Sequence, residues 1–260
     1  MLEVIDKGSA NEAHPVPLLF VHGACGTAWC WDDHFLDFFA DRGYRAVALS
    51  LRGHGASSVS KPLRSCSIAD YVDDVRAVAD TLGTAPVLIG HSMGCLVVLD
   101  YLVGRSSPAA VLMAPATPQG LRRLAYRIIR RHPWIALRVN TFGNPADLFN
   151  TSALAREFLF CASTPDSIVR SCAIRVEPES TRAVRETATH LPAAGLVTAP
   201  LLVLGAKKDG SRIDGDVSAV ARTYQTDAEL FSDMGHMLML EPGWQAVAEM
   251  VDSWLTGRGL

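Results

Sequence analysis

Short apolar runs alternate with amphipathic segments along the chain. Runs of Val, Leu and Ile without polar alternation are typical of strands buried on both faces of a parallel sheet. They predict strands over Pro17–Val21, Arg45–Leu49, Val87–Gly90, Ala110–Ala114, Leu201–Gly205 and Glu229–Phe231. Helical periodicity predicts helices over Asp32–Asp41, Ile68–Leu82, Met93–Leu102, Val217–Thr223 and Trp244–Leu255. This alternation predicts an α/β fold, with a mostly parallel sheet flanked by helices.

The interval 117–195 breaks this alternation. It has helical patterns but no strand pattern, and it carries 11 Arg and no Lys against 6 acidic residues. Its net charge is therefore +5, whereas the rest of the chain has −8. We expect residues 117–195 to form a helical cap inserted between the two halves of a core made of residues 1–116 and 196–260. Such a cap would cover the carboxyl edge of the sheet, where ligands of open α/β sheets bind.

The overall composition is that of a globular protein without a strongly charged surface. The 260 residues carry a net charge of −3 and are 49% hydrophobic, which excludes a disordered chain and an overall basic nucleic-acid binder. Apolar runs stay below the roughly 18–20 residues of a membrane-spanning helix, and the first residues lack the apolar stretch of a signal peptide. We therefore expect a cytoplasmic protein with no transmembrane segment and no nucleic-acid partner.

The six cysteines show no zinc-binding spacing with one another or with histidine. In a chain of this length without a secretory signal, we expect free thiols that pack like small apolar residues. The sequence therefore predicts neither a bound metal nor a cofactor.

The segment Gly90-His91-Ser92-Met93-Gly94 has a G-x-S-x-G pattern between a predicted strand and a predicted helix. A strand that turns sharply into a helix holds its corner residue in a strained conformation, and flanking glycines remove the side chains that would collide there. Ser92 would then project its hydroxyl from the turn as a nucleophile. The next helix directs its N-terminus at the same point, where the Met93 N–H can stabilise an oxyanion.

A serine nucleophile needs a general base, and His236 is the best placed of eight histidines because it follows the last predicted strand. His22 follows the first predicted strand, where a backbone role is more natural. His54 lies in a glycine-rich turn of the kind that shapes a pocket floor. The side chain of His91 is expected to face away from that of Ser92.

The base in turn needs a carboxylate that fixes its tautomer and stabilises the imidazolium. Asp209 stands just beyond the strand predicted over Leu201–Gly205. Asp214 and Asp216 lie farther from the strand end, and Asp233 is expected in a solvated turn. The predicted order of the catalytic residues along the chain is Ser, Asp, His.

Taken together, these segments resemble the esterase/lipase-like group of α/β-hydrolases. The shared stretches are His22-Gly-Ala-Cys-Gly-Thr-Ala-Trp-Cys-Trp, Leu49-Ser-Leu-Arg-Gly-His-Gly-Ala-Ser, Gly90–Gly94, Gly205-Ala-Lys-Lys-Asp and Gly235-His236. The resemblance implies an α/β-hydrolase fold with Ser92 as nucleophile, Asp209 as acid and His236 as base. It also implies that the Ala24 N–H is the second oxyanion donor, beside that of Met93.

The resemblance further implies a serine hydrolase that cleaves a carboxylic ester through an acyl-enzyme on Ser92. Its substrate would be a small molecule with an apolar acyl part, such as a lysophospholipid or a monoglyceride. The same catalytic set would also serve a thioesterase or a C–C bond hydrolase, and a hydrolase-like binding protein could keep it in vestigial form. The sequence leaves these alternatives open.

The segment 121–131 is the most basic part of the predicted cap. Helical pitch places Leu121, Leu124, Ala125, Ile128 and Ile129 on one side, and Arg122, Arg123, Arg127, Arg130 and Arg131 on the other. The apolar side is expected to face the pocket, with the arginines in solvent. Alternatively, the arginines form a rim that attracts lipid headgroups, acyl-CoA phosphates or a membrane surface, which would give weak membrane contact.

Overall fold

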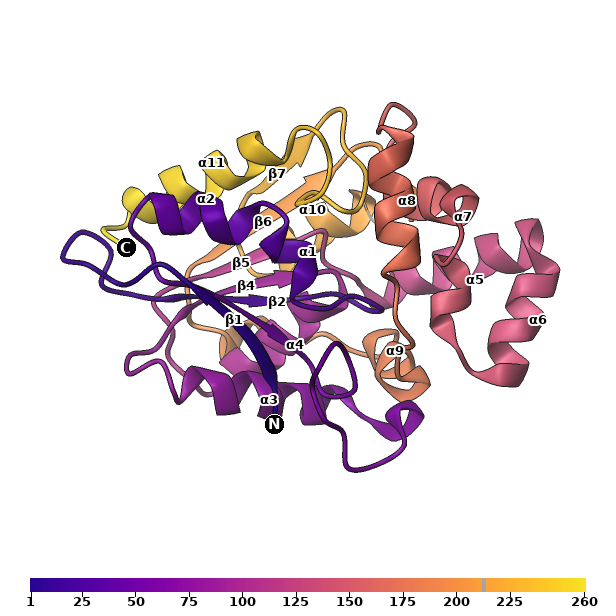
Figure 1. Ribbon diagram of the computed structural model, residues 1–260, viewed down its shortest axis with the longest axis horizontal. Helices are drawn as coiled ribbons and strands as arrows, with labels where there is room; N and C mark the ends of the chain where they lie inside the picture. The colour runs from indigo at the N-terminus through magenta and orange to yellow at the C-terminus, as the bar shows by residue number, and fades with distance from the viewer. Residues whose placement is uncertain (212–213) are drawn as a thin grey trace.

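Seven strands form one sheet at the centre of the protein (Figure 1). A computed structural model describes residues 1–211 and 214–260. The strands are β1 (Glu3–Lys7), β2 (Leu18–Val21), β3 (Ala46–Ser50), β4 (Val87–His91), β5 (Ala110–Met113), β6 (Leu201–Ala206) and β7 (Ala228–Phe231). Their order is β1-β3-β2-β4-β5-β6-β7, in which β1 pairs antiparallel with β3 and every other pair is parallel. The predicted α/β class with a mostly parallel sheet is confirmed.

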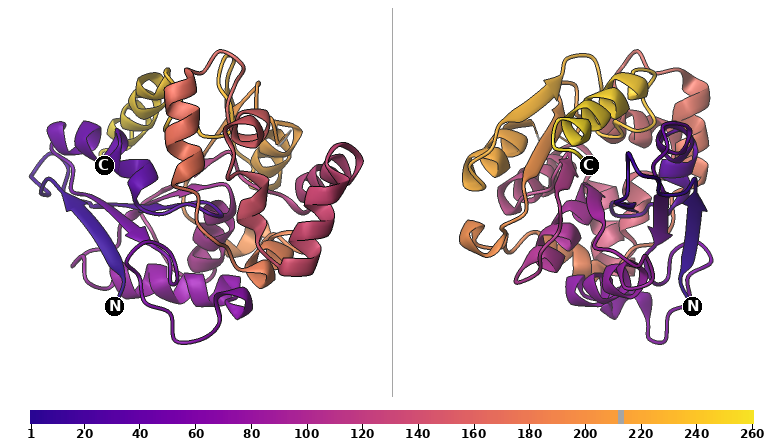
Figure 2. Two further views of the ribbon diagram at one scale, coloured as in Figure 1. Left: turned by 45° about the vertical axis from the view of Figure 1, so that its right-hand side comes forward. Right: turned by 90° about the vertical axis from the view of Figure 1, so that its left-hand side faces the viewer.

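Helices cover both faces of the sheet (Figures 1 and 2). One face packs against α1 (Trp29–Asp32), α2 (Phe35–Asp41) and α11 (Trp244–Thr256), and the other against α3 (Ile68–Ala79), α4 (Met93–Leu102) and α10 (Asp214–Thr223). Successive residues of β2 divide between the two cores, because Leu18 and Phe20 enter the first and Leu19 and Val21 the second. Burial on both faces explains the unbroken apolar runs in the sequence.

Two elements differ from the prediction. The apolar pattern misses β1, because this edge strand alternates half-buried and exposed residues and includes the charged Glu3, Asp6 and Lys7. The helix predicted over Asp32–Asp41 is wrong as a single element: it is two helices, α1 and α2, because His34 leaves helical geometry with φ of −150°. The other predicted strands and helices end within three residues of the observed ends.

The segment between β5 and β6 is helical and lies at the end of the sheet where the parallel strands finish (Figure 1). It contains α5 (Pro118–Arg131), α6 (Pro133–Phe142), α7 (Ser152–Leu159), α8 (Asp166–Ile174), α9 (Thr181–Thr187) and 3-10 helices at Pro145–Leu148 and Ala194–Leu196. We call residues 117–195 the helical insertion. Of all the helices in the described part of the chain, none is both long and apolar enough to cross a membrane.

The orientation of α5 agrees with the prediction only in part. Leu121, Leu124 and Ile128 face inward as predicted. Arg127, however, is half-buried with its guanidinium 3.2 Å from Glu157, whereas Ala125 and Ile129 are exposed. Residues two apart in a helix lie on nearly opposite sides, so a helix that turns Arg127 inward turns Ala125 and Ile129 outward. The predicted apolar face is therefore too wide.

Close backbone contacts build the turn between β4 and α4. Ser92 stands at its corner with φ of +51° and ψ of −117°, a conformation that residues with side chains rarely adopt. A Cβ added to Gly90 would lie 2.7 Å from Gly94 O, and one added to Gly94 would lie 2.5 Å from His22 O. The start of α4 thus rests directly against the end of β2.

We expect Gly94→Ala to lower the free energy of unfolding by about 1–3 kcal/mol, because the backbone must move to accommodate the new methyl group. Urea unfolding followed by circular dichroism measures the change. Gly195→Ala is the matched control: an added Cβ there meets nothing within 4 Å, so its free energy of unfolding should stay within about 0.5 kcal/mol of wild type. Equal stabilities of the two variants would contradict the tight contact at Gly94.

Candidate active site

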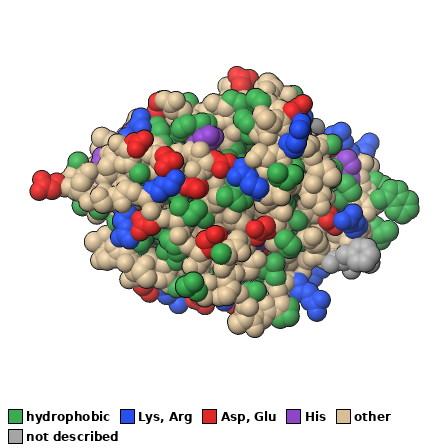
Figure 3. Space-filling view, in the orientation of Figure 1, with side chains coloured by type: hydrophobic (Ala, Val, Ile, Leu, Met, Phe, Trp, Pro, Cys, Tyr) green, Lys and Arg blue, Asp and Glu red, His purple; other side chains and the backbone are tan. Residues whose placement is uncertain are grey.

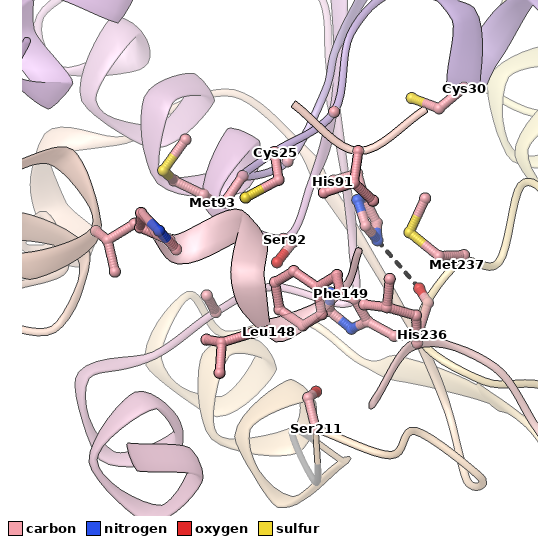
Figure 4. A pocket seen from close by; sticks show the side chains of 18 of the residues that line it. Cys25, Cys30, His91, Ser92, Met93, Leu148, Phe149, Ser211, His236 and Met237 are labelled. Carbon is pink, nitrogen blue, oxygen red and sulfur yellow. Dashed lines mark hydrogen bonds between the residues drawn. The ribbon is translucent and has the colours of Figure 1, made fainter. Parts of the chain in front are cut away.

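A pocket lies between the ends of the parallel strands and the helical insertion (Figure 4). Its volume is about 130 Å³. The sheet side contributes the loop after β2, the β4–α4 turn and the loop after β7, and the insertion contributes apolar side chains that include Leu121, Leu124, Leu148 and Phe149. Four predicted site residues line this pocket, and the fifth contacts one of them: they are Ala24, Ser92, Met93 and His236, with Asp209 bonded to His236.

Ser92 is half-buried in the wall of the pocket. Its N–H donates a hydrogen bond to Met113 O at 2.9 Å, which fastens the strained corner to the end of β5. Figure 4 shows its hydroxyl directed into the pocket, near Phe149 of the insertion. A molecule held in the pocket would therefore contact this hydroxyl.

His236 and Asp209 form a buried hydrogen-bonded pair. His236 Nδ1 lies 2.7 Å from Asp209 Oδ2, and both side chains are buried. Asp209 Oδ1 accepts hydrogen bonds from the Ser211 N–H, at 2.8 Å, and from the Ser211 hydroxyl. Since Nδ1 donates to the carboxylate, Nε2 is the acceptor nitrogen of the His236 ring.

The competing aspartates do not share this position. Asp233 is exposed in the turn after β7. Asp214 opens α10, and its side chain and that of Asp216 lie outside the described residues. Lys207 and Lys208 precede Asp209, but both side chains are exposed.

The loop after β2 brings Ala24 to the pocket. His22 is buried at its start, where Nε2 accepts a hydrogen bond from the Leu51 N–H at 3.0 Å and Nδ1–H donates to Gly23 O at 2.8 Å. Burial lowers the pKa of His22 to about 3, so this ring is a neutral structural bridge between two loops. Gly23 permits the approach to Ser92, because an added Cβ would lie 2.9 Å from Ser92 Cβ.

His91 also reaches the pocket, a contact that the sequence does not predict. Its Nε2–H donates to His236 O at 3.0 Å, and the centres of the two rings are 4.7 Å apart (Figure 4). Burial, together with the nearby His236, lowers the pKa of His91 well below its ordinary value, so the ring stays neutral. His91 therefore fixes the backbone of the residue predicted to be the base.

Glu241 is a buried carboxylate that fixes the loop after β7. Its Oε1 accepts hydrogen bonds from the Gly235 N–H at 2.8 Å and the Cys161 N–H at 2.7 Å, and its Oε2 accepts one from the Thr164 hydroxyl. One side chain thus connects this loop to the helical insertion. Sequence reasoning missed it, and the available signal is an acidic residue that ends the apolar run Met237–Leu240.

Glu179 of the helical insertion has a similar role beneath the loop after β2. Its buried carboxylate accepts hydrogen bonds from the Cys25 N–H at 3.1 Å and the Tyr71 hydroxyl at 2.6 Å, and lies 3.2 Å from His54 Nε2. Cys25 has φ of +63° and directly follows Ala24. Glu179 therefore supports a strained residue next to the predicted oxyanion donor.

Glu179 and His54 each shift the pKa of the other toward its charged form. Burial opposes the charge on His54, but the adjacent carboxylate outweighs burial and raises the pKa of His54 above its ordinary value. Burial likewise opposes the charge on Glu179, yet His54 and Tyr71 outweigh it and lower the pKa of that carboxyl. This buried contact joins the helical insertion to the turn after β3, and the two shifts favour an ion pair there.

Each of the six cysteines is a free thiol. All six are free and buried, as predicted. Burial raises the pKa of the Cys25, Cys30 and Cys172 thiols, which line the pocket without thiolate character. Within the described residues, no group of three or more His, Cys, Asp or Glu side chains could hold a metal ion.

The chain is similar to known proteins in both sequence and structure. The sequence profile of the alpha/beta hydrolase family matches residues 18–250. A segment of 80 residues, 30% of the chain, is 40% identical to protein ABHD8 of Homo sapiens and covers 18% of it. A segment of 100 residues, 38% of the chain, is 38% identical to the non-heme chloroperoxidase of Streptomyces lividans and covers 35% of it. These matches span well under two thirds of the length of either relative.

The likeness in structure extends over the whole chain. A thermophilic esterase from Thermogutta terrifontis superposes on 100% of this chain and 94% of its own, with a TM-score of 0.74. The two sequences are 23% identical. At this identity the superposition establishes the shared fold.

We expect Glu179→Gln to destabilise the protein in a pH-dependent way. Because folding raises the pKa of His54, the protonated ring stabilises the fold fully at pH values below 6.5, its ordinary pKa. This contribution is lost as the pH rises through the raised pKa. Because folding lowers the pKa of Glu179, the ionised carboxylate stabilises the fold fully at pH values above 4.5, its ordinary pKa. This contribution is lost as the pH falls through the lowered pKa. The loss in the variant should therefore be greatest between pH 4.5 and 6.5, at about 3 kcal/mol.

Urea unfolding at a series of pH values measures this difference. Glu229→Gln removes the same charge from an exposed position and serves as the control, with a small and pH-independent effect. A Glu179→Gln loss that stays constant from acid to alkaline pH would show that the pair is not charged.

Proposed function

Because the chain belongs to the alpha/beta hydrolase family, we propose that it is a serine hydrolase that cleaves carboxylic esters through an acyl-enzyme on Ser92. The observation that carries this proposal is the buried His236–Asp209 pair at 2.7 Å, in the same pocket as the strained Ser92. An imidazole oriented by a carboxylate beside a serine hydroxyl is suited to activate that hydroxyl as a nucleophile.

In this mechanism the Ser92 hydroxyl attacks the ester carbonyl carbon while His236 Nε2 takes its proton. Asp209 keeps Nδ1–H of the ring directed at the carboxylate and stabilises the imidazolium. The Ala24 and Met93 N–H groups stabilise the oxyanion of the tetrahedral intermediate. Collapse of this intermediate expels the alcohol, which takes the proton from His236. A water molecule activated by His236 then hydrolyses the acyl-enzyme and releases the acid.

The lining of the pocket favours an uncharged, apolar ester. Among the described residues that form the wall, none is Lys, Arg, Asp or Glu, so a charged group bound there would lose its hydration without gaining a partner. A volume of about 130 Å³ is close to that of an apolar cavity of roughly 150 Å³ that holds benzene. The enclosed part therefore suits a short acyl chain or a ring, and a charged head group or the rest of a long lipid chain would remain outside it.

Ser92→Ala should abolish ester hydrolysis, with kcat lower by roughly four orders of magnitude or more, because the nucleophile is lost. A p-nitrophenyl ester assay and labelling by a fluorophosphonate measure the effect. Ser211 is the other serine in the pocket wall, and Ser211→Ala should still react with the fluorophosphonate. Labelling that persists in Ser92→Ala and disappears in Ser211→Ala would move the nucleophile to Ser211.

Asp209→Asn should lower kcat for the same ester by about 10⁴-fold, because the amide can favour the wrong tautomer of His236. Asp233→Asn is the matched control, since Asp233 is the exposed carboxylate nearby in the chain, and its rate should equal that of wild type. A crippled Asp233→Asn beside a fully active Asp209→Asn would reassign the acid.

A further inference from the structure

The outer face of α5 and α6 exposes large apolar side chains. Trp134 is 80% exposed, and Tyr126, Ile129 and Leu137 are each more than half exposed. These two helices project from the end of the molecule (Figure 1), where hydrophobic and basic side chains gather on the surface (Figure 3). A soluble domain seldom exposes so many large apolar side chains in two adjacent helices without a partner.

The same helices are strongly basic. Residues 118–142 contain six arginines and no acidic residue. Two acidic side chains from elsewhere in the insertion pair with three of them: Glu157 with Arg127 and Arg131, and Asp147 with Arg138. Arg122 and Arg130 are exposed beside Tyr126, and together they border one surface hollow. The outer face therefore combines a positive charge with exposed aromatic and aliphatic groups.

The inner side of α5 belongs to the candidate active site. Leu121 and Leu124 line the pocket, and the exposed Arg122 lies between them in the sequence. A helix with its side chains is roughly 10–12 Å across. A surface bound to the outer face would thus be separated from the pocket by the thickness of a single helix.

We propose that the face formed by Arg122, Tyr126, Ile129, Arg130, Trp134 and Leu137 docks on an anionic lipid bilayer. Arginines attract acidic headgroups, aromatic rings of Trp and Tyr settle at the headgroup level, and the aliphatic side chains enter the acyl boundary. Docking would bring the wall of the pocket to the bilayer, where apolar esters dissolve. This last consequence rests on the proposed esterase function, whereas the docking itself does not.

The charge and the apolar groups together favour a bilayer over other occupants. A second copy of this chain on the same face would bring two positively charged surfaces together, and like charges repel. A nucleic acid would engage the arginines, but its phosphates would offer nothing to the exposed Ile129 and Leu137. An anionic bilayer complements both kinds of side chain.

Sedimentation of the full chain with vesicles tests the docking. One set of vesicles contains phosphatidylcholine alone and the other an equimolar mixture with phosphatidylglycerol. We expect binding to the mixed vesicles only, weakened by salt. Arg122→Gln/Arg130→Gln should lower the affinity roughly 30-fold, on the usual contribution of two basic side chains near an anionic surface. Arg170→Gln/Arg185→Gln removes the same charge from exposed positions in α8 and α9, and should bind as wild type does.

Fluorescence quenching by brominated lipids tests the depth of Trp134. Trp134 is the one tryptophan among the residues of the proposed face and is 80% exposed, whereas Trp31 is fully buried. We expect brominated mixed vesicles to quench wild type and to quench Trp134→Phe far less, although Trp134→Phe still sediments. Quenching that is the same in both proteins would place Trp134 away from the bilayer and overturn the proposed orientation.

Three outcomes would overturn the docking proposal itself. They are equal binding to neutral and mixed vesicles, equal binding of the two double-arginine variants, and a lipid-free dimer that Trp134→Ser dissociates. The proposed function fails separately, because vesicle binding needs no turnover and Ser92→Ala should bind as wild type does. Arg122→Gln/Arg130→Gln should hydrolyse a soluble short ester at the wild-type rate. If the wild-type protein binds vesicles but cleaves no ester, the esterase proposal alone is overturned.

Discussion

The loop after β2 meets the start of α4 at a distance that only glycine permits, and the rest of the pocket depends on that contact. Gly23 and Gly94 stand at the meeting point, and Ser92 keeps its positive φ between them. Because β2 and β4 are neighbours in a parallel sheet, both segments arrive at the same edge. The strained corner persists because buried cores on both faces of the sheet fix the two strands that lead into it.

Two buried carboxylates extend this constraint to the helical insertion. Glu241 ties the loop after β7 to the backbone of Cys161, and Glu179 ties the loop after β2 to the insertion from the other side. Each carboxylate is surrounded by donors, so its burial is compensated by hydrogen bonds or by an ion pair. The proposed base and the proposed oxyanion donor Ala24 are therefore positioned by the insertion as well as by the sheet.

Sequence reasoning reaches those parts of the molecule that local patterns encode. Apolar runs identify six strands, and the glycine pattern identifies the turn at Ser92, because both depend on neighbours along the chain. The edge strand β1 is not predicted from the sequence, because a strand half-exposed to solvent needs no continuous apolar run. The roles of Glu179 and Glu241 are not predicted either, because each buried acid depends on a partner far away in the sequence. These partners include Cys25 and Cys161, and no local sequence pattern identifies them.

The location of these two anchors makes the site more dependent on one half of the helical insertion than on the other. Glu179 and the 161–164 segment both lie in its second half, where they hold loops of the candidate site. Residues 118–142 contribute a wall and an outer face but neither anchor. Replacement of this helical pair would keep both carboxylate anchors, and the loop after β6 would lose the hydrogen bond that the Arg127 guanidinium donates to Gly210 O. The same exchange across residues 161–179 would dismantle the site.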